Sequence, residues 1–282
     1  AISGTSTATT EPAIAAFTNV TASGIQVNWT ANGNLNPGTL YRVLTSTASD
    51  PTLPGTGQVV TTSDTYNFSL STSGLNVNTT YYFKIAAVNN NNVPSNYITP
   101  TPSTATLAAA PTLLSFSNIT TSAIELSWTT SNPYPGTLYR VLASTASDPA
   151  NPGTGQIVTT SDTYNVSLTT AGLYINTTYY FKVGAINHNS VPAYAAITGT
   201  STATTEPAIA AFTNVTASGI QVNWTANGNL NPGTLYRVLT STASNPLSPG
   251  TGQVVTTSDT YNFSLSTSGL NVNTTYYFKI AA

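Results

Sequence analysis

Apolar and polar residues alternate with a period of two in several short stretches of the chain. The segment IQVNW at 25–29 places its three apolar residues on one face and its two polar residues on the other. The segment YYFKIAA at 81–87 alternates in the same way. Because successive side chains of a strand point to opposite faces, both segments predict β-strands. No stretch shows a sustained helical period, so we expect an all-β chain.

Clusters of turn-forming residues separate these strand-like runs, as in ANGNLNPGT, SDPTLPGTGQ and STSGLNVN. Gly, Asn and Pro favour turns because they tolerate or preset the backbone angles that turns require. Short strands separated by turns every ~8–12 residues, about seven to a unit, predict a β-sandwich.

The strand pattern occurs three times. Trp29, Trp128 and Trp224 lie in matching contexts (IQVNWTA, IELSWTT and IQVNWTA), which indicates a repeating unit of about a hundred residues. Residues 1–87 and 196–282 are nearly identical, whereas the middle unit is a more distant relative. The differences between the two outer copies are Ser3/Thr198, Asp50/Asn245, Thr52/Leu247 and Leu53/Ser248. The order A–B–A is typical of a longer alternating repeat.

Each unit carries a Trp at the end of its second strand, a YRV at the start of its third, and the motif L-x-x-N-T-x-Y-x-F towards its end. These features resemble fibronectin type III modules, in which the Leu and the Thr-x-Tyr form a tyrosine corner. The matching residues are Leu75, Thr79 and Tyr81, then Leu173, Thr177 and Tyr179, then Leu270, Thr274 and Tyr276. The family often has Pro where this chain has Val77, Ile175 and Val272. The resemblance implies tandem immunoglobulin-like sandwiches, which we expect to belong to a prokaryotic surface or filament protein.

A module of this kind needs a final strand after the YYFK strand, and we expect that strand at 96–107 and 193–205. The opening segment AISGTSTATT matches residues 196–205 almost letter for letter, so it has the sequence of a final strand. The expected segments are 1–10 (final strand of a preceding or neighbouring module), 11–107 (module 1), 108–205 (module 2) and 206–282 (module 3 without its last strand).

Two interpretations account for the missing and the extra strand. In the first, which we prefer, the sequence is a stretch of a continuous repeat chain, because nearly identical repeats make any starting point equally natural. In the second, one subunit donates residues 1–10 to the last module of a neighbour, as in donor-strand complementation. Both interpretations predict a filament or stalk. The candidate interface residues at the two ends are Ala1, Ile2, Tyr277, Phe278, Lys279 and Ile280.

The composition excludes several classes of function. Only six residues are Lys or Arg and eight are Asp or Glu, so the chain lacks the clustered cations of a nucleic-acid site. No apolar run approaches the ~18–20 residues of a membrane-spanning helix. Cys and Met are absent, which excludes disulfides and thiolate metal sites and suits an oxidising, extracellular environment.

No combination of residues predicts catalysis or a cofactor. The single histidine, His188, lies in the INHNS turn of the middle unit and has no counterpart in the other units. Asp64 and its counterparts in TTSDTYN are interpreted as turn formers. The PGTGQ loop lacks the Lys and the helix of a phosphate-binding loop. We therefore expect no catalytic residue, no metal and no cofactor.

Glycosylation is the modification that the sequence suggests. Of the candidate sites, Asn28 and Asn67 are expected to face solvent because they lie between inward-pointing residues. The Asn-x-Ser/Thr positions are Asn19, Asn28, Asn67, Asn78, Asn118, Asn165, Asn176, Asn214, Asn223, Asn262 and Asn273. The alternative explanation is that outward-facing strand positions are usually polar, so these Asn residues need no glycan to account for them.

One sheet face is a further candidate for assembly. If Tyr41 and Val43 point inward, the intervening side chains point outward, and we expect two exposed Leu beside one Arg, one Lys and one Tyr. These residues are Leu40, Arg42, Leu44, Tyr82 and Lys84. The face either forms a contact between modules or subunits, or contains a cation–π pair in which Lys guards the sheet.

The sequence thus predicts a non-enzymatic structural repeat segment of an extracellular filament, stalk or fibre at a cell surface. Its expected partner is itself, as a homopolymer or neighbouring repeat, and glycans are a further candidate. The alternative is an adhesin, or carbohydrate-binding spacer modules of a secreted protein, in which exposed Tyr82, Tyr97 and Tyr134 stack on sugars.

Overall fold

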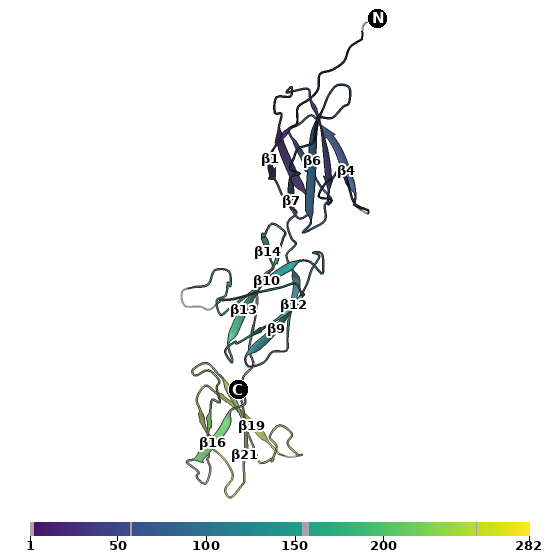
Figure 1. The fold of residues 1–282 in the computed structure, drawn as a ribbon. Coiled ribbons are helices and arrows are strands. Elements are labelled where there is room, and N and C mark those ends of the chain that lie inside the picture. The colour runs from purple at the N-terminus through teal and green to yellow at the C-terminus, as the bar shows by residue number, and fades with distance from the viewer. Residues whose placement is uncertain (1–2, 57, 154–157, 252) are drawn as a thin grey trace.

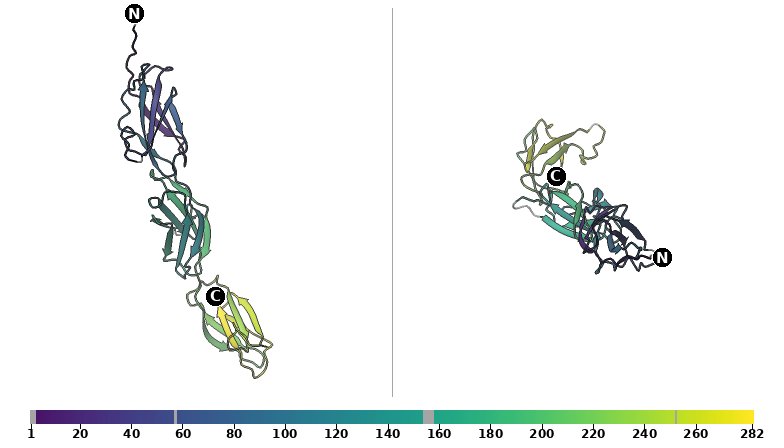
Figure 2. Two further views of the ribbon diagram at one scale, coloured as in Figure 1. Left: turned by 90° about the vertical axis from the view of Figure 1, so that its right-hand side faces the viewer. Right: turned by 90° about the horizontal axis from the view of Figure 1, so that it is seen from above.

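The computed structural model describes residues 3–282 except 57, 154–157 and 252. In this part of the chain all regular elements are strands, which confirms the predicted all-β class. The strands form three sandwiches that follow one another end to end (Figures 1 and 2). We refer to β1–β7 as module 1, β8–β15 as module 2 and β16–β21 as module 3. Ala1 and Ile2, two candidate interface residues, lie outside the described part.

The strand bounds follow the repeat. Module 1 contains β1 (Ala13–Thr18), β2 (Ile25–Thr30), β3 (Leu40–Ser46), β4 (Val60–Thr65), β5 (Ser69–Thr72), β6 (Thr80–Val88) and β7 (Ser103–Ala105). Module 2 contains β8 (Thr112–Ser117), β9 (Ala123–Thr129), β10 (Leu138–Ser144), β11 (Val158–Thr163), β12 (Ser167–Ala171), β13 (Thr178–Ile186), β14 (Pro192–Tyr194) and β15 (Thr198–Ser201). Module 3 contains β16 (Ala208–Thr213), β17 (Gln221–Thr225), β18 (Tyr236–Ser241), β19 (Val255–Thr260), β20 (Ser264–Ser266) and β21 (Tyr277–Ala281).

Each module pairs a three-stranded sheet with a second sheet of three to five strands. In module 1 the orders are β1-β2-β5 and β4-β3-β6-β7. In module 2 the second sheet is β11-β10-β13, and both β14 and β15 pair with β13. In module 3 the second sheet is β19-β18-β21. The modules therefore differ chiefly in the strands that pair with the outer edge of β6, β13 or β21: β7 pairs with β6, and β14 and β15 pair with β13.

The core lies between the two sheets, where the alternating pattern predicts it. Ile25, Val27 and Trp29 are at most 2% exposed. The Trp29 ring packs on Tyr41 with a centroid distance of 5.7 Å, and Trp128 and Trp224 contact the matching Tyr in the same way. Burying a large apolar side chain stabilises a fold by about 1.5–3 kcal/mol, so this cluster is the main source of each module's stability.

The last strand of each complete module is interrupted. Within the expected segment 96–107, only Ser103–Ala105 forms regular strand. Upstream of it, the Ile98 N–H still donates to Ile85 O at 3.0 Å. Pro100 and Pro102 cannot donate to a strand ladder, which explains the break in module 1. In module 2 the same region is divided into β14 and β15, and the Ala195 N–H donates to Val183 O between them.

Module 3 has a smaller buried core than the other two. Phe83 and Phe181 are fully buried, but the matching Phe278 is only half-buried. Tyr81 and Tyr179 are 8% and 6% exposed, whereas Tyr276 is half-buried. Phe278 and Tyr276 lie on or beside β21, which within the described residues has no strand on its outer edge, whereas later residues of the chain cover the outer edges of β6 and β13.

Candidate functional site: the module junctions and the edge of β21

The three arginines form ion pairs across neighbouring strands. Arg42 on β3 donates two hydrogen bonds to the Asp64 carboxylate on β4, from Nε at 3.0 Å and from Nη2 at 2.9 Å. Arg140–Asp162 and Arg237–Asp259 repeat this geometry. The guanidinium hydrogen bonds lower the pKa of the Asp64 carboxyl. The interpretation of Asp64 as a turn former was therefore wrong, because Asp64 lies inside a strand, directly opposite Arg42.

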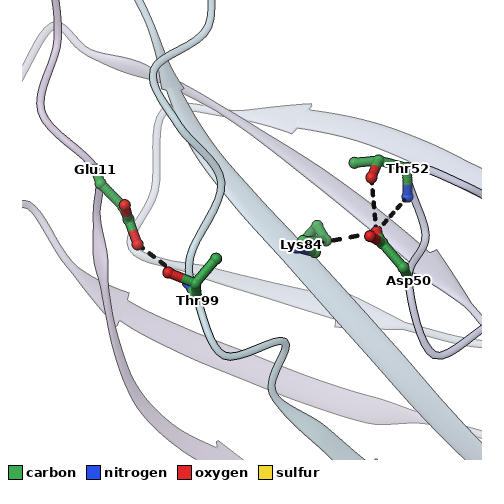
Figure 3. A network of polar contacts seen from close by, with 5 residues as sticks. All are labelled: Glu11, Asp50, Thr52, Lys84 and Thr99. Carbon is green, nitrogen blue, oxygen red and sulfur yellow. Dashed lines mark hydrogen bonds and ion pairs between the residues drawn. The ribbon is translucent and has the colours of Figure 1, made fainter.

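Lys84 on β6 is buried at 8% exposure and faces the loop after β3. Its Nζ lies 3.9 Å from Asp50 Oδ1, which also accepts two hydrogen bonds from Thr52 (Figure 3). These Thr52 hydrogen bonds are the largest cause of the lowered pKa of Asp50, and the Lys84 charge adds to them. In module 3, Asn245 replaces Asp50, and the matching Lys279 is exposed.

The expected exposed assembly face is wrong for module 1. Leu40, Leu44 and Tyr82 are half-buried, Arg42 is engaged with Asp64, and Lys84 is buried. In module 2 the ring of Tyr194 covers part of the same face: its centroid lies 5.4 Å from Lys182 Nζ, and a Cβ added to Gly184 would lie 2.7 Å from the ring. This face is therefore less exposed than expected, and the contact between modules or subunits that was expected there stays a prediction.

The tyrosine corner that the resemblance implies is present in every module. The Tyr81 hydroxyl accepts the Asn76 N–H at 2.9 Å, and the same bond joins Tyr174 N–H to Tyr179 and Asn271 N–H to Tyr276. The corner fixes the loop before β6, β13 and β21. That loop also holds an Asn in the left-handed region in each module, at φ of 47°, 46° and 52° for Asn78, Asn176 and Asn273.

This left-handed Asn joins one module to the next. At the first junction, Asn78 Nδ2 donates to Thr137 Oγ1 of module 2 at 2.9 Å, and the two residues are 2% and 1% exposed. At the second junction, Asn176 Nδ2 donates to Thr234 Oγ1 at 2.7 Å. A buried hydrogen bond between side chains restricts the angle between two bodies, since bending leaves both groups without partners.

A second set of polar contacts supports the first junction. Asn187 Nδ2 donates to the Thr106 carbonyl at 3.2 Å, and Asn189 Nδ2 donates to Thr104 Oγ1 at 2.8 Å. His188, an exposed residue of this loop, has its Nδ1 3.1 Å from Thr80 Oγ1. All three residues come from the loop after β13 and contact the last strands of module 1.

Residues 3–10 lie on module 1 in the way that the end of module 1 lies on module 2. Asn89 Nδ2 donates to the Thr7 carbonyl at 3.5 Å and Asn91 Nδ2 to Thr5 Oγ1 at 3.0 Å, which are the counterparts of the Asn187 and Asn189 contacts. The segment is also clamped at its end, where Asn34 bonds both the N–H and the carbonyl of Thr10. Asn132 holds Ala109 and Asn229 holds Thr205 in the same way.

The strand partners of β21 differ from those of its counterparts β6 and β13 within the described residues. β6 pairs with β3 and β7, and β13 pairs with β10, β14 and β15. Within the described residues, β21 pairs only with β18. A groove of about 260 Å³ lies beside the loop that leads into β21, lined by Thr216, Ile220, Asn273 and Thr274 among others.

The candidate residues of β21 differ in exposure. Tyr277 is 40% exposed, Lys279 is exposed, Phe278 is half-buried and Ile280 is 4% exposed. Alternation therefore directs Ile280 into the core and leaves Tyr277 and Lys279 on the outer face.

The Asn-x-Ser/Thr positions divide by burial. Asn78 is buried in the first junction, so the structure contradicts it as a glycosylation site. Asn176 is half-buried in the second junction, and the half-buried Asn28 bonds Thr18 Oγ1 across the sheet rather than facing solvent freely. Asn223 is half-buried in the same way. The exposed positions are Asn19, Asn67, Asn118, Asn165, Asn214, Asn262 and Asn273.

The Tyr residues that were expected to stack on sugars differ in how exposed their side chains are. Tyr134 is 54% exposed, but Tyr82 and Tyr97 are half-buried. The described residues contain no cluster of His, Cys, Asp and Glu that could bind a metal. The PGTGQ loops at 54–58, 152–156 and 249–253 lie partly outside the described residues.

The sequence did not predict the junction role of Asn78 and Asn176. The available signal was the repeated N-T-T before each YYF strand, which was interpreted as part of the corner and as a glycosylation motif. No helix in the described part of the chain is long and apolar enough to span a membrane.

Comparison with known proteins agrees with this architecture. The family model "Fibronectin type III domain" matches residues 10–101 and 109–198. Among solved structures, a two-domain fibronectin type III segment of chicken tenascin is similar, with 19% identity over 67% of this chain and 99% of that one, at a TM-score of 0.44. No curated protein matches the chain. Domains of this family are typically non-enzymatic structural modules and are commonly extracellular. The two matched regions cover more than half of the sequence, and the chain therefore belongs to the fibronectin type III domain family.

Proposed function

We propose that this chain is a structural repeat segment of an extracellular filament, stalk or fibre at a prokaryotic cell surface. The observation that carries the proposal is the repeated junction. Asn78–Thr137 and Asn176–Thr234 join successive modules by the same buried or half-buried hydrogen bond, although modules 1 and 2 differ in sequence. A repeated junction imposes a repeated angle between modules, so adding modules extends a rod.

The surface composition supports this role. Five of the six cationic side chains form ion pairs within their own module: Arg42, Lys84, Arg140, Lys182 and Arg237. The rest of the surface is rich in hydroxyl and amide groups, which are uncharged at any ordinary pH. A rod of this kind keeps its shape over a wide range of pH and salt, because few of its contacts depend on exposed charge.

The proposal is tested by negative-stain imaging of native material with an antibody raised against module 2. The expected result is labelled fibres of uniform width, with label spaced regularly along them. Labelled single particles without fibres would refute the structural role.

A second candidate function is adhesion or carbohydrate binding. It is favoured by one exposed Tyr that recurs in each module after the β4, β11 or β19 strand: Tyr66, Tyr164 and Tyr261 are 66%, 60% and 63% exposed. Exposed aromatic rings can stack on the apolar faces of sugars. Glycan-array binding that disappears in the triple Tyr→Ala variant would support this function, and an array without signal would exclude it for the glycans tested.

A further inference from the structure

We propose that Asn67, Asn165 and Asn262 carry N-linked glycans, one in each module, and that these glycans keep the outer edges of β4, β11 and β19 from pairing with other strands. This inference goes beyond the proposed structural role and does not depend on it. Each Asn begins an Asn-x-Ser sequence and lies two residues after the end of one of these strands. The site is therefore at the same place in all three modules.

The strands β4, β11 and β19 each form one edge of the second sheet of their module, and β4 lies at the side of module 1 (Figure 1). Strand edges are templates for pairing with other chains, so proteins protect them with bulges, short strands, Pro or Lys. The edges of the first sheet have such protection. β1, β8 and β16 contain register shifts, and β5, β12 and β20 have only four, five and three residues.

The β4, β11 and β19 edges have none of these protections. All three strands read VTTSDT, a sequence without Pro or Lys in which Val and Thr favour strand structure. Six consecutive residues pair with the neighbouring strand without a register shift. The one charge, on Asp64 in β4, is paired with Arg42, and its counterparts are paired in the same way. The strand itself therefore offers little against pairing with another chain.

The turn after β4 does not need the side chain of Asn67. Asn67 is exposed, its backbone N–H donates to Thr65 Oγ1 at 3.1 Å, and its side-chain amide forms no hydrogen bond within the described residues. Its φ is not in the left-handed region. The same hydrogen bond from the backbone N–H recurs in modules 2 and 3. Because Asn67 also lies outside the strands, the usual polarity of outward strand positions does not account for it.

The other exposed Asn-x-Ser/Thr positions have a role in the fold. Asn19 Nδ2 donates to Gln26 Oε1 at 2.6 Å, across the turn between β1 and β2. Asn118 and Asn214 form the matching contacts in their modules. These three residues and Asn273 have positive φ, a conformation in which Asn is enriched. Turn geometry therefore explains these four residues, whereas it does not explain Asn67.

Glycosylation requires a glycosyltransferase and an oligosaccharide linked to a lipid diphosphate. The bond between Asn67 Nδ2 and the anomeric carbon of the sugar forms as the bond from that carbon to the diphosphate oxygen breaks. The lipid diphosphate leaves, and the nitrogen loses one proton to a base of the enzyme. Because the Asn67 amide has no hydrogen bond within the described residues, the folded module gives up no contact of this group to accommodate the sugar.

An exposed Tyr precedes each of the three Asn residues. Tyr66, Tyr164 and Tyr261 are 66%, 60% and 63% exposed. An aromatic ring beside the attachment point is available to pack on the apolar face of the first sugar. The recurring Tyr then contacts the glycan of its own module, and the solvated glycan lies in the way of a strand that approaches the edge of β4.

Tryptic peptide mapping of native material by mass spectrometry tests the sites. Cleavage after the Arg and Lys residues gives peptides 43–84, 141–182 and 238–279, which differ in sequence and each contain one proposed site. Fragment spectra are expected to place glycans on Asn67, Asn165 and Asn262. Asn78 and Asn176 lie in the first two peptides and serve as internal controls that are expected to be unmodified. Native peptides without a glycan at the three sites would overturn the assignment.

The protective role is tested with the 282-residue chain made in a host that lacks the transferase, by size-exclusion chromatography with light scattering over a range of concentrations. This unglycosylated chain is expected to associate side by side. A variant with Lys at an exposed position of each edge is expected to associate at least about tenfold more weakly. The substitutions are Thr62→Lys, Thr160→Lys and Thr257→Lys, combined in one chain.

A matched variant adds the same charge to β2, β9 and β17, which are not sheet edges. Its substitutions are Thr30→Lys, Thr129→Lys and Thr225→Lys, all at exposed positions, and it is expected to associate as the original chain does. An unglycosylated chain that stays monomeric at all concentrations overturns the protective role. Association that the edge variant leaves unchanged, or that both Lys variants weaken equally, overturns it as well.

A last comparison separates the glycan from the Asn side chain in the native host. Ser69→Ala, Ser167→Ala and Ser264→Ala together remove the Asn-x-Ser motif and keep each Asn, so fibres of this variant are expected to bundle side by side. The corresponding Ser→Thr variant keeps the motif and is expected to give separate fibres. Separate fibres in the Ala variant would contradict the protective role. The proposed structural role depends on the junctions within one chain and stands apart from these outcomes.

Discussion

The buried Asn78–Thr137 hydrogen bond predicts how stiff the first junction is. Asn78→Gly removes the side chain and keeps a residue that tolerates the left-handed φ of 47°. One buried hydrogen bond contributes about 0.5–1.5 kcal/mol net. Asn78 Oδ1 is buried and has no hydrogen-bond partner in the described residues. Removing this unpaired acceptor offsets part of the free energy that is lost with the hydrogen bond. We therefore expect the straight junction to lose about 1 kcal/mol relative to bent states, which raises the bent-to-straight ratio about fivefold.

Distance measurement by electron spin resonance tests this value. The chain contains no Cys, so two labels can be attached at Tyr66→Cys and Tyr164→Cys, both at exposed positions of modules 1 and 2. The distance distribution between the labels is expected to broaden in Asn78→Gly. The matched change Asn176→Gly is expected to leave this distribution unchanged and to broaden the distances between modules 2 and 3.

Asn273→Gly serves as the control for the backbone effect of the substitution. Asn273 has the same conformation, with φ of 52°, and is exposed. This variant is expected to leave both inter-module distances as they are in the original chain. If Asn78→Gly also leaves the first distance unchanged, the hydrogen bond does not set the junction angle, and the argument for a stiff rod fails.

Three further predictions concern single side chains. Asp64→Asn is expected to lower the free energy of unfolding by less than about 1 kcal/mol near neutral pH. Because folding lowers the pKa of Asp64, this contribution is present above the unfolded pKa of about 3.9 and is lost as the pH falls through the folded pKa. Thermal unfolding curves of the variant and the original chain should therefore converge in acid. Tyr179→Phe leaves the Tyr174 N–H without its acceptor and is expected to cost about 1–3 kcal/mol in a urea titration; no change would show that the corner is dispensable. Peptide mapping of native material is expected to find Asn78 unmodified, and a glycan on it would contradict the buried junction, whereas the exposed Asn67 can be occupied.

The strands and the core could be predicted because their signals are local. The alternation in 25–29 is a property of neighbouring residues, and the burial of Ile25, Val27 and Trp29 follows from it directly. The tyrosine corner is also local, since Asn76 and Tyr81 are five residues apart.

The outward faces were harder to predict because alternation only separates one side of a sheet from the other. It places Lys84 opposite Phe83 but does not show that a loop of the same module, carrying Asp50, covers Lys84. The pairing of Arg42 with Asp64 depends on the register of β3 with β4, and a shift of one residue would separate the two charges.

By itself, the sequence determined that the chain is all-β, that it contains three related sandwiches, and which apolar side chains form their cores. Periodicity and near-identity are written along the chain, so no contact had to be known to read them. Only the tertiary structure decided that Asn78 meets Thr137, 59 residues away, and that Asn176 meets Thr234. The physical reason is that a junction depends on how folded modules are placed against one another. An Asn in a left-handed turn has the same local sequence whether its amide faces the next module or solvent.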